Sequence, residues 1–331
     1  QDRFSSKIFL SGSRKNSSEA RVINQSNSPF ARGVAEIQMK KENFAAYIFL
    51  LPWLVGFFLL TIQPIVSSFY LSLTEYDTVS DPYFIGFEHY EYMFVDDYRF
   101  WEALKVTFFY VAVGVPFKLG FALAIALWLN QGVQGLSLYR AVFYLPSLLG
   151  SSVAVGILWR QVFHTDGLVN YLLAFLGISG PSWLSDPDTS IYTVILLTIW
   201  QFGSPMLIFL AGLRQIPHDL YEASSIDGAS KFRQFWKITL PLLAPVIFFN
   251  LVLQTIDAFK TFNNVFIISG GNGSPVDSLL FYTLYLYQQG FEFFRMGYAS
   301  ALAWVLLIII SIFTAIYFYT SKYWVYYESE K

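Results

Sequence analysis

The sequence predicts an all-α polytopic membrane protein with six transmembrane helices. Of its 331 residues, 55% are hydrophobic and only 13% are charged, and the mean hydropathy is +0.47. A soluble domain of this size carries more charge. A bilayer core about 30 Å thick needs about 20 apolar residues per helix. Six stretches reach that length, at residues 46–73, 104–129, 138–160, 190–213, 239–264 and 298–320.

Helices explain these stretches better than strands do. A membrane β-barrel would show segments of about ten residues in which polar and apolar side chains alternate. The six stretches are continuous apolar runs instead, which indicates helices.

The distribution of charge predicts the orientation. Residues 1–43 form a polar tail, and residues 44–331 form the transmembrane domain. Eight of the 21 Lys and Arg residues precede the first span, so the positive-inside rule places the tail in the cytoplasm. Six spans return the C-terminus to the same side. The loop over 75–102 is rich in Asp and Glu, which suits the external side.

Several classes of site are excluded by composition. The chain has no Cys and three His residues that stand apart, so we expect no metal site. It lacks a GxxxxGK[ST] loop, the usual cradle for nucleotide phosphates. No basic cluster suggests a nucleic-acid partner. We therefore predict no catalytic residues, no enzyme activity and no cofactor in this chain.

One charged segment interrupts the apolar runs, EASSIDGASKFRQFW at residues 222–236. Asp219 and Glu222 have the spacing of a capping box, which predicts a helix that starts there. Gly228 suits the left-handed residue that ends this helix, and Ser230 suits the start of a second one. The segment is predicted to be a helix, a turn and a helix on the cytoplasmic side.

The side chains of this segment suit a plug that enters another protein. Small residues let a partner approach the backbone, and aromatic residues supply surface to bury. The small residues are Ala223, Ser224, Ala229 and Ser230, and the bulky ones are Tyr221, Phe232 and Trp236. An amphipathic connector that rests on the membrane surface is the alternative.

The run EASSIDGASKFRQFWKITLPLLAP resembles the EAA loop of membrane subunits of bacterial ABC importers, roughly E-A-A-x-x-D-G-A followed by I-x-L-P. Ser224 replaces the second Ala, a change between small residues. We place this coupling loop at residues 217–241. The pattern positions are Glu222, Ala223, Asp227, Gly228, Ala229, Ile238, Leu240 and Pro241.

The resemblance extends over nearly the whole chain from about Ala46. Segments such as AYIFLLPWLVGFFLL, RAVFYLPSLL and FLAGLRQIP are similar to those of the carbohydrate-uptake branch, the maltose-type and glycerol-phosphate-type subunits. The external loop SGGNGSP resembles the T-G-G-G-P of that family, with Asn272 inserted.

The resemblance implies a type I ABC importer transmembrane domain in the bacterial cytoplasmic membrane. The expected function is that of a permease subunit for a sugar or oligosaccharide. The implied partners are a second homologous permease, two ATPase subunits that bind ATP and Mg, an extracytoplasmic solute-binding protein, the carbohydrate substrate and membrane lipid. The residues expected to couple to the ATPases are Glu222, Ala223, Ser224, Asp227, Gly228 and Ala229.

Polar residues within the spans are candidates for the substrate path. On the fifth span they recur at intervals of three and four, on one helical face, at Asn250, Gln254, Asp257, Thr261 and Asn264. A charge in mid-span costs roughly 2.5–3.5 kcal/mol, so such residues usually face a bundle interior or a cavity. Hydrogen bonds from Asn250, Gln254 and Asp257 to sugar hydroxyls are one interpretation, and bonds between helices are the other.

Three further candidates lie in the second and fourth spans. Gln201 and Ser204 flank a helix-breaking Gly203. Lys118 lies near the middle of its span, too deep to reach the interface. We expect an ion pair with a neighbouring carboxylate to explain Lys118, and an acidic glycan or phosphate ester is the alternative. Lys260 has the spacing to pair with Asp257.

Two other classes of protein compete with the importer permease. An ion-coupled secondary transporter would use Lys118 and Asp257, and it would show inverted repeats with broken helices at matched positions of two halves. No such symmetry is visible in the sequence. An intramembrane enzyme ranks last, because no nucleophile with a base is apparent.

Overall fold

The computed structural model describes residues 47, 49–132 and 134–325. The predicted tail over 1–43 lies outside the described residues. Contacts divide the chain into two compact units between Ser68 and Phe69, and each is described by itself. The first unit contains most of one helical span, Phe49–Leu71. This span includes the π-helical turn η1 (Phe58–Ile62) and, directly after it, α3 (Gln63–Leu71).

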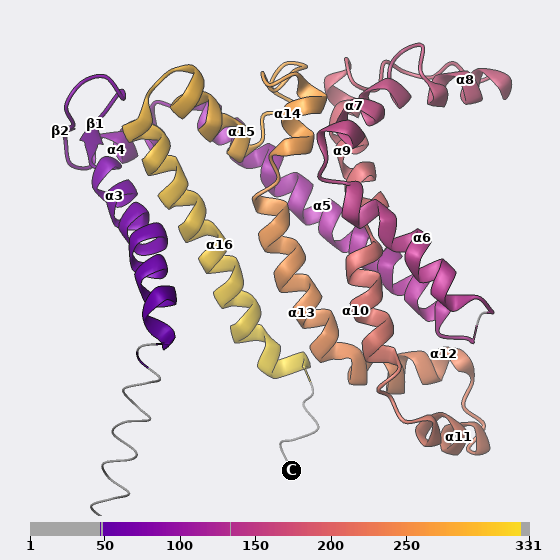
Figure 1. Ribbon diagram of the computed structural model, residues 1–331. Helices are drawn as coiled ribbons and strands as arrows, with labels where there is room; N and C mark the ends of the chain where they lie inside the picture. The colour runs from indigo at the N-terminus through magenta and orange to yellow at the C-terminus, as the bar shows by residue number, and fades with distance from the viewer. Residues whose placement is uncertain (1–46, 48, 133, 326–331) are drawn as a thin grey trace, which may run out of the picture. The chain divides into compact units, whose positions relative to one another are not determined.

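The second unit is built around α5 (Tyr98–Leu129). Packed against it are α9 (Pro187–Trp200), α10 (Gly203–Leu213) and α13 (Leu240–Phe259), while α16 (Met296–Trp324) packs on α13 (Figure 1). Buried positions recur along α5 every three or four residues from Phe100 to Leu129, the period of one helical face. Ala103, Ala122 and Ala126 on this face are fully buried. Small residues of this kind let membrane helices approach closely.

Four helices of the described residues are long and apolar enough to cross a membrane, or up to six if each bent pair is one span. The first bent pair is α6 (Leu136–Leu149) and α7 (Val153–Val162), at 96°, and the second is α9 and α10, at 42°. The prediction of a continuous helix over 138–160 is therefore wrong. The chain turns at Gly150, and Ser152 restarts the helix by accepting a hydrogen bond from Val155 N, as an N-cap does.

The fifth span also differs from its prediction. One helix runs from Lys231 to Phe259, through α12 (Lys231–Gln234), the π-helical turn η2 (Phe235–Thr239) and α13. It ends at Phe259, five residues before the predicted end at 264, and α14 (Asn263–Ser269) begins separately. The π-helical turn precedes Pro241, which lacks the backbone donor of a regular helix.

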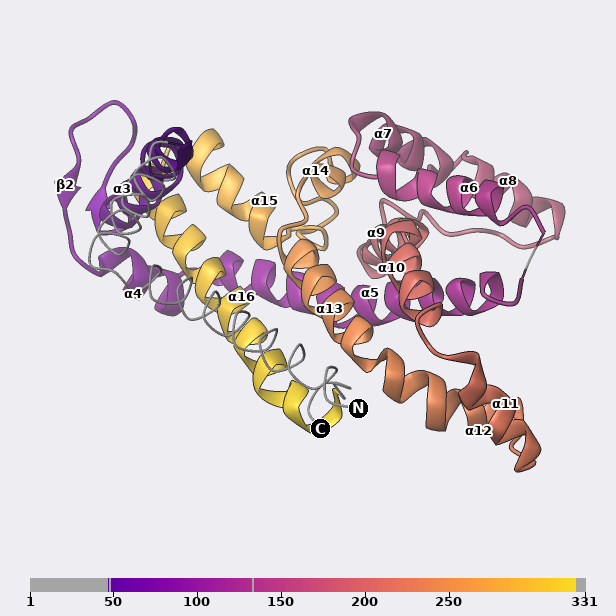
Figure 2. The ribbon, with the colours of Figure 1, turned by 60° about the horizontal axis from the view of Figure 1, so that its bottom comes forward.

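Shorter elements gather at the two ends of this second unit (Figures 1 and 2). One end carries β1 (Thr74–Glu75) paired antiparallel with β2 (Tyr83–Phe84), together with α4 (Glu88–Val95), α14, α15 (Tyr282–Tyr287), the π-helical turn η3 (Gln288–Glu292), α7 and α8 (Leu168–Phe175). The opposite end carries α11 (His218–Ile226) and α12. The candidate site lies between these ends.

Candidate functional site

A cavity of about 540 Å³ opens among α5, α6, α9, α10, α13, the loop after α13 and the start of α14. Most of its lining residues have polar side chains. The polar residues that line it are Tyr110, Lys118, Ser147, Ser151, Thr198, Gln201, Ser204, Gln254, Asp257, Lys260, Thr261, Asn263 and Asn264. Five of the six residues expected on the substrate path are among them, and Asn250 is the exception.

The polar face of α13 reaches the cavity only in part. Gln254 and Asp257 line it, and so do Thr261 and Asn264, although these two lie beyond the end of α13 and not on a continuous helix as predicted. Asn250, one turn before Gln254, is fully buried. Neither polar atom of its side chain has a hydrogen-bond partner among the described residues. Asn250 therefore neither lines the cavity nor joins two described helices.

Lys118 lacks the ion pair that we expected. Within the described residues, ion pairs up to 4.0 Å form only between Arg99 and Asp277 and between Lys105 and Glu102. The expected pairs of Lys118 with a carboxylate and of Lys260 with Asp257 are absent there. Lys118 is half-buried, and it faces the same cavity as Asp257 and Lys260.

Tyr110 joins three segments of the cavity wall and was missed by the sequence analysis. Its hydroxyl lies 2.6 Å from Thr198 Oγ1 on α9 and 3.4 Å from Thr261 Oγ1 after α13. Tyr110 precedes Lys118 by two helical turns on α5, so the two side chains share a face. This spacing from Lys118 was the one signal in the sequence that could have placed Tyr110 at the cavity. It was not used, because a tyrosine within an apolar run does not stand out as a polar residue.

The two helix breaks lie against each other at the cavity wall. Gln201 Nε2 donates to the carbonyl of Gly150 at 3.0 Å, and Ser147 Oγ donates to the carbonyl of Gln201 at 2.9 Å. The backbone N–H of Ser204 donates to Ser147 Oγ at 2.9 Å. Backbone groups freed by a break inside a membrane protein need such partners. The Gln201 amide nitrogen, predicted to face the solute, is thus engaged by the wall itself.

The coupling segment is a helix, a turn and a helix, as predicted, with a different start. Gly228 adopts φ +76°, the left-handed conformation that glycine accommodates. Ser230 accepts a hydrogen bond from Arg233 N and caps α12. The capping box is wrong, because α11 begins at His218 behind Pro217, and no side chain caps it. Pro217 is extended (φ −60°, ψ 133°) and directly precedes the helix, so Asp219 lies inside the first turn.

Hydrogen bonds make this segment a connected unit. Gln234 Nε2 on α12 donates to Ser224 Oγ and to Ser225 Oγ on α11, each at 2.9 Å. The hydroxyls of Tyr221 and Thr239 lie 2.9 Å apart. Ser224 therefore does more than substitute one small residue for another, since its hydroxyl accepts a bond that an alanine could not.

Much of α11 and of the turn after it is exposed among the described residues. Glu222, Ala223, Asp227 and Gly228 are exposed, while Ser224 and Ala229 are half-buried. Large apolar side chains are exposed beside them, including Ile226 at 87% and Phe232 at 74%. An apolar patch next to acidic residues is typical of a protein interaction surface.

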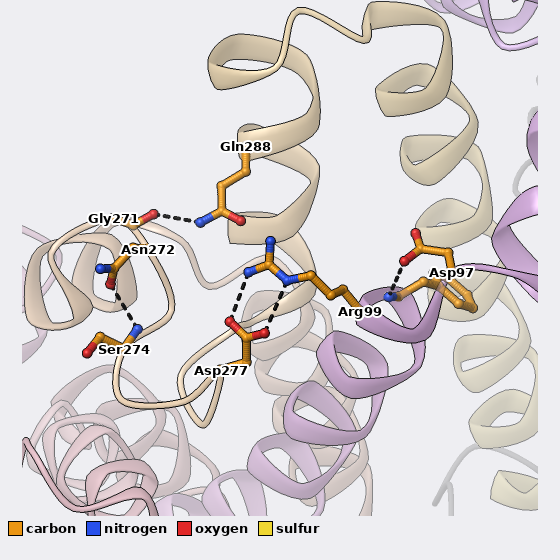
Figure 3. Close-up of polar contacts among 8 residues, drawn as sticks. Asp97, Arg99, Gly271, Asn272, Ser274, Asp277 and Gln288 are labelled. Carbon is orange, nitrogen blue, oxygen red and sulfur yellow. Dashed lines mark hydrogen bonds and ion pairs between the residues drawn. The ribbon is translucent and has the colours of Figure 1, made fainter.

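Polar contacts also fix the loop between α14 and α15, at the other end of the unit (Figure 3). Arg99, in the first turn of α5, donates two hydrogen bonds to the carboxylate of Asp277. Gln288 Nε2 donates to the carbonyl of Gly271 at 2.9 Å. Asn272, the inserted residue, accepts a bond from Ser274 N at 2.9 Å and so stabilises the turn from within.

These features define the class of protein as a membrane-embedded transport subunit: a helical bundle with a polar cavity between its ends and a rigid, exposed helix pair at one end. The family described as binding-protein-dependent transport system inner membrane component matches residues 98–323. The chain belongs to this family, the permease subunits of ABC importers.

Named relatives agree with this placement. The chain is 52% identical over 294 residues to the probable ABC transporter permease protein YesP of Bacillus subtilis, covering 88% of this chain and 95% of YesP. It is 31% identical over 287 residues to the trehalose/maltose transport system permease protein MalF of Thermococcus litoralis, covering 86% of this chain and 95% of MalF.

A solved structure supports the fold. A bacterial ABC transporter involved in the import of the acidic polysaccharide alginate contains a chain that superposes with a TM-score of 0.75 at 21% identity. The match covers 87% of this chain and 98% of that one. The all-α fold of an ABC importer transmembrane subunit is thereby confirmed.

Proposed function

We propose that this chain conducts a sugar or oligosaccharide through the bacterial cytoplasmic membrane, as one of two homologous permease subunits. The polar cavity of about 540 Å³ in the bundle is the observation that carries the proposal. Hydroxyl and amide groups suit the many hydroxyls of a carbohydrate. Similar permeases are named for trehalose/maltose, arabinooligosaccharides and sulfoquinovosyl glycerol. Asp257 and Lys260 are exposed on this chain alone, which suits a second permease that completes the wall.

Energy for transport comes from two separate ATPase subunits, which bind ATP and Mg, because this sequence has no GxxxxGK[ST] loop. The exposed side of α11 is their docking surface, and both chain termini share its cytoplasmic side. The bonds from Gln234 to Ser224 and Ser225 let α11 and α12 move together. Closure of the ATPases then biases the bundle between inward-open and outward-open states.

An extracytoplasmic solute-binding protein docks at the other end, around α4, α14 and α15. A solved structure related to this chain is an alginate transporter in complex with an alginate pentasaccharide-bound periplasmic protein, which supports a partner of this kind. Side-chain bonds hold the loop between α14 and α15 at Gly271 and at Asp277.

Reconstitution tests the proposal. The four-subunit complex in lipid vesicles, with its binding protein outside and MgATP inside, is supplied with labelled maltose and arabino-oligosaccharides. Uptake is expected to require hydrolysable MgATP and the binding protein together. Uptake driven by an imposed ion gradient without ATP would establish the ion-coupled secondary transporter instead.

A further inference from the structure

We propose that the cavity selects a solute that carries an oxyanion, such as a uronic acid or a sulfated or phosphorylated sugar, and that Lys118 is the residue that recognises it. The proposal rests on the proposed transport function and narrows its substrate class. It depends on the position of Lys118, on the charge of the cavity and on the donors and acceptors around it.

Lys118 is half-buried and lies far from either end of α5. It lies on the buried face of α5, among Val115, Leu119 and Ala122, which are 2%, 8% and 0% exposed. The end of α5 at Leu129 is about three helical turns away, or roughly 16 Å at ~1.5 Å per residue. Its ammonium group therefore cannot reach the interface along its own helix. A lysine at this depth marks a pathway or a counter-ion.

The charge balance of the cavity favours an anion. Its charged lining residues are Lys118, Lys260 and Asp257. In the part of the chain that the structure describes, neither lysine has a carboxylate within 4.0 Å. One positive charge is thus in excess on the part of the wall that this chain supplies. An oxyanion beside Lys118 would gain a charge-assisted hydrogen bond from its ammonium group.

The neighbouring groups suit the rest of a carbohydrate. Ser204 can exchange hydrogen bonds with sugar hydroxyls, and Gln254 offers both a donor and an acceptor. The Thr198 hydroxyl is already bonded to Tyr110 and to the carbonyl of Val194. Asp257 would accept from a hydroxyl and repel a second anion near it. The arrangement therefore fits one oxyanion among several hydroxyls better than a neutral sugar.

A first test measures the charge of the cavity directly. The natural chain has no cysteine, so Ser204→Cys places a single thiol on the wall. In the purified complete complex, its reaction rates with an anionic and a cationic methanethiosulfonate of similar size are followed by the mass of this chain. Lys118→Met is expected to lower the anionic-to-cationic rate ratio about tenfold, the effect of ~1.4 kcal/mol, and Lys118→Arg to preserve it.

A second test identifies the solute class. Oligosaccharides that carry a uronic acid, a sulfate or a phosphate are compared with neutral oligosaccharides of equal length. ATP hydrolysis and uptake are measured with one preparation of the binding protein at a saturating concentration. Lys118→Met is expected to reduce uptake of the acidic sugars at least tenfold, while Lys118→Arg stays within about threefold. Lys105→Met is the matched control, because Lys105 lies on the same helix but is 76% exposed and does not line the cavity.

The outcomes separate this inference from the proposed function. An unchanged reagent ratio in Lys118→Met, or equal losses for acidic and neutral sugars, overturns the oxyanion site while ATP-dependent uptake stands. If uptake of one of the three acidic classes, uronic-acid, sulfated or phosphorylated, depends most strongly on Lys118, that group is the oxyanion that Lys118 recognises. If no glycan is transported, the proposed function fails, and the reagent ratio still decides whether the cavity favours anions.

Discussion

Arg99 and Asp277 join two segments that lie far apart in the sequence. Arg99 Nη2 and Nε donate to the two carboxylate oxygens of Asp277 at 2.8 and 3.1 Å, so the start of α5 holds the loop between α14 and α15. Asp277 has φ +58°, and an aspartate tolerates this left-handed conformation better than most residues. The conformation of the loop is thus favoured locally by the residue type at position 277 and is held by the bonds from Arg99.

We expect the pair to stabilise the complex by about 1 kcal/mol, since both side chains are partly exposed and salt screens them. Asp277→Asn keeps the backbone preference and removes the charge, and Arg99→Gln removes its partner. Each single variant should lower the melting temperature of the complex and weaken stimulation by the binding protein. The double variant should lose less than the sum of the two. Additive losses would show that the pair contributes nothing.

The turn of the coupling segment depends on one glycine. A Cβ at Gly228 would have no atom within 4 Å, so the strain of a side chain there comes from φ +76° alone. Gly228→Ala is expected to cost about 1 kcal/mol and to reduce uptake and uptake-linked ATP hydrolysis severalfold. Gly228→Asn is the control, because asparagine visits this conformation readily. Equal activity of the two variants would contradict the role of the turn.

His89 should make stability depend on pH. Its Nε2 donates to the carbonyl of Thr74 at 3.0 Å. Burial lowers the pKa of His89, and the bond to Thr74 opposes this only in part. Well above pH ~6.5, the ordinary pKa of histidine, neither the folded nor the unfolded state binds the proton. As pH falls below it, the unfolded chain takes up a proton that the folded chain resists, so stability falls.

The measurement compares the melting temperature of the complex between pH 8 and pH 5.5. The natural protein is expected to lose more stability over this interval than His89→Gln, in which an amide can still donate to Thr74 but does not titrate. The same loss in both proteins would assign the pH dependence to other groups.

Much of this fold follows from local sequence properties. The apolar lengths and the period of α5 are visible in the sequence, as are the left-handed Gly228 and the cap at Ser230. The 96° bend after α6 was missed because Gly150 and Ser151 are weak breakers inside an apolar run. What fixes that bend is the contact with Gln201, about fifty residues later in the chain.

Many residues of the candidate site were predictable from the sequence, but the contacts between them were not. Polar and charged residues in mid-span were found because burying them is costly, and five of the six candidates line the cavity. Their pairing was not predictable, since the absence of an ion pair at Lys118 depends on how α5 packs against α13. Likewise, the inward role of Ser224 depends on Gln234, which a motif comparison does not reveal.

The close approach of α10 to α6 gives a test of the packing at the breaks. A Cβ at Gly203 would lie 2.3 Å from the carbonyl oxygen of Phe143 and 2.7 Å from Tyr144 Cα. Because these are backbone atoms, Gly203→Ala should displace α6 and destabilise the complex by about 1–3 kcal/mol. Gly120→Ala is the control, as nothing lies within 4 Å of that Cβ. Unchanged melting temperature in Gly203→Ala would show that the two helices separate freely.

A substitution at Asn250 distinguishes a role of this residue in transport from a role in holding helices together. Its side chain is fully buried and has no hydrogen-bond partner among the described residues, and an unpaired buried polar group costs about 1–3 kcal/mol. Asn250→Leu, of similar size, should therefore leave assembly and melting temperature unchanged or raised. A bond between helices would instead make this variant lose assembly. If the solute contacts Asn250 when the path opens beyond Gln254, uptake falls in the stable variant, with Gln254→Leu as the comparison from the cavity wall.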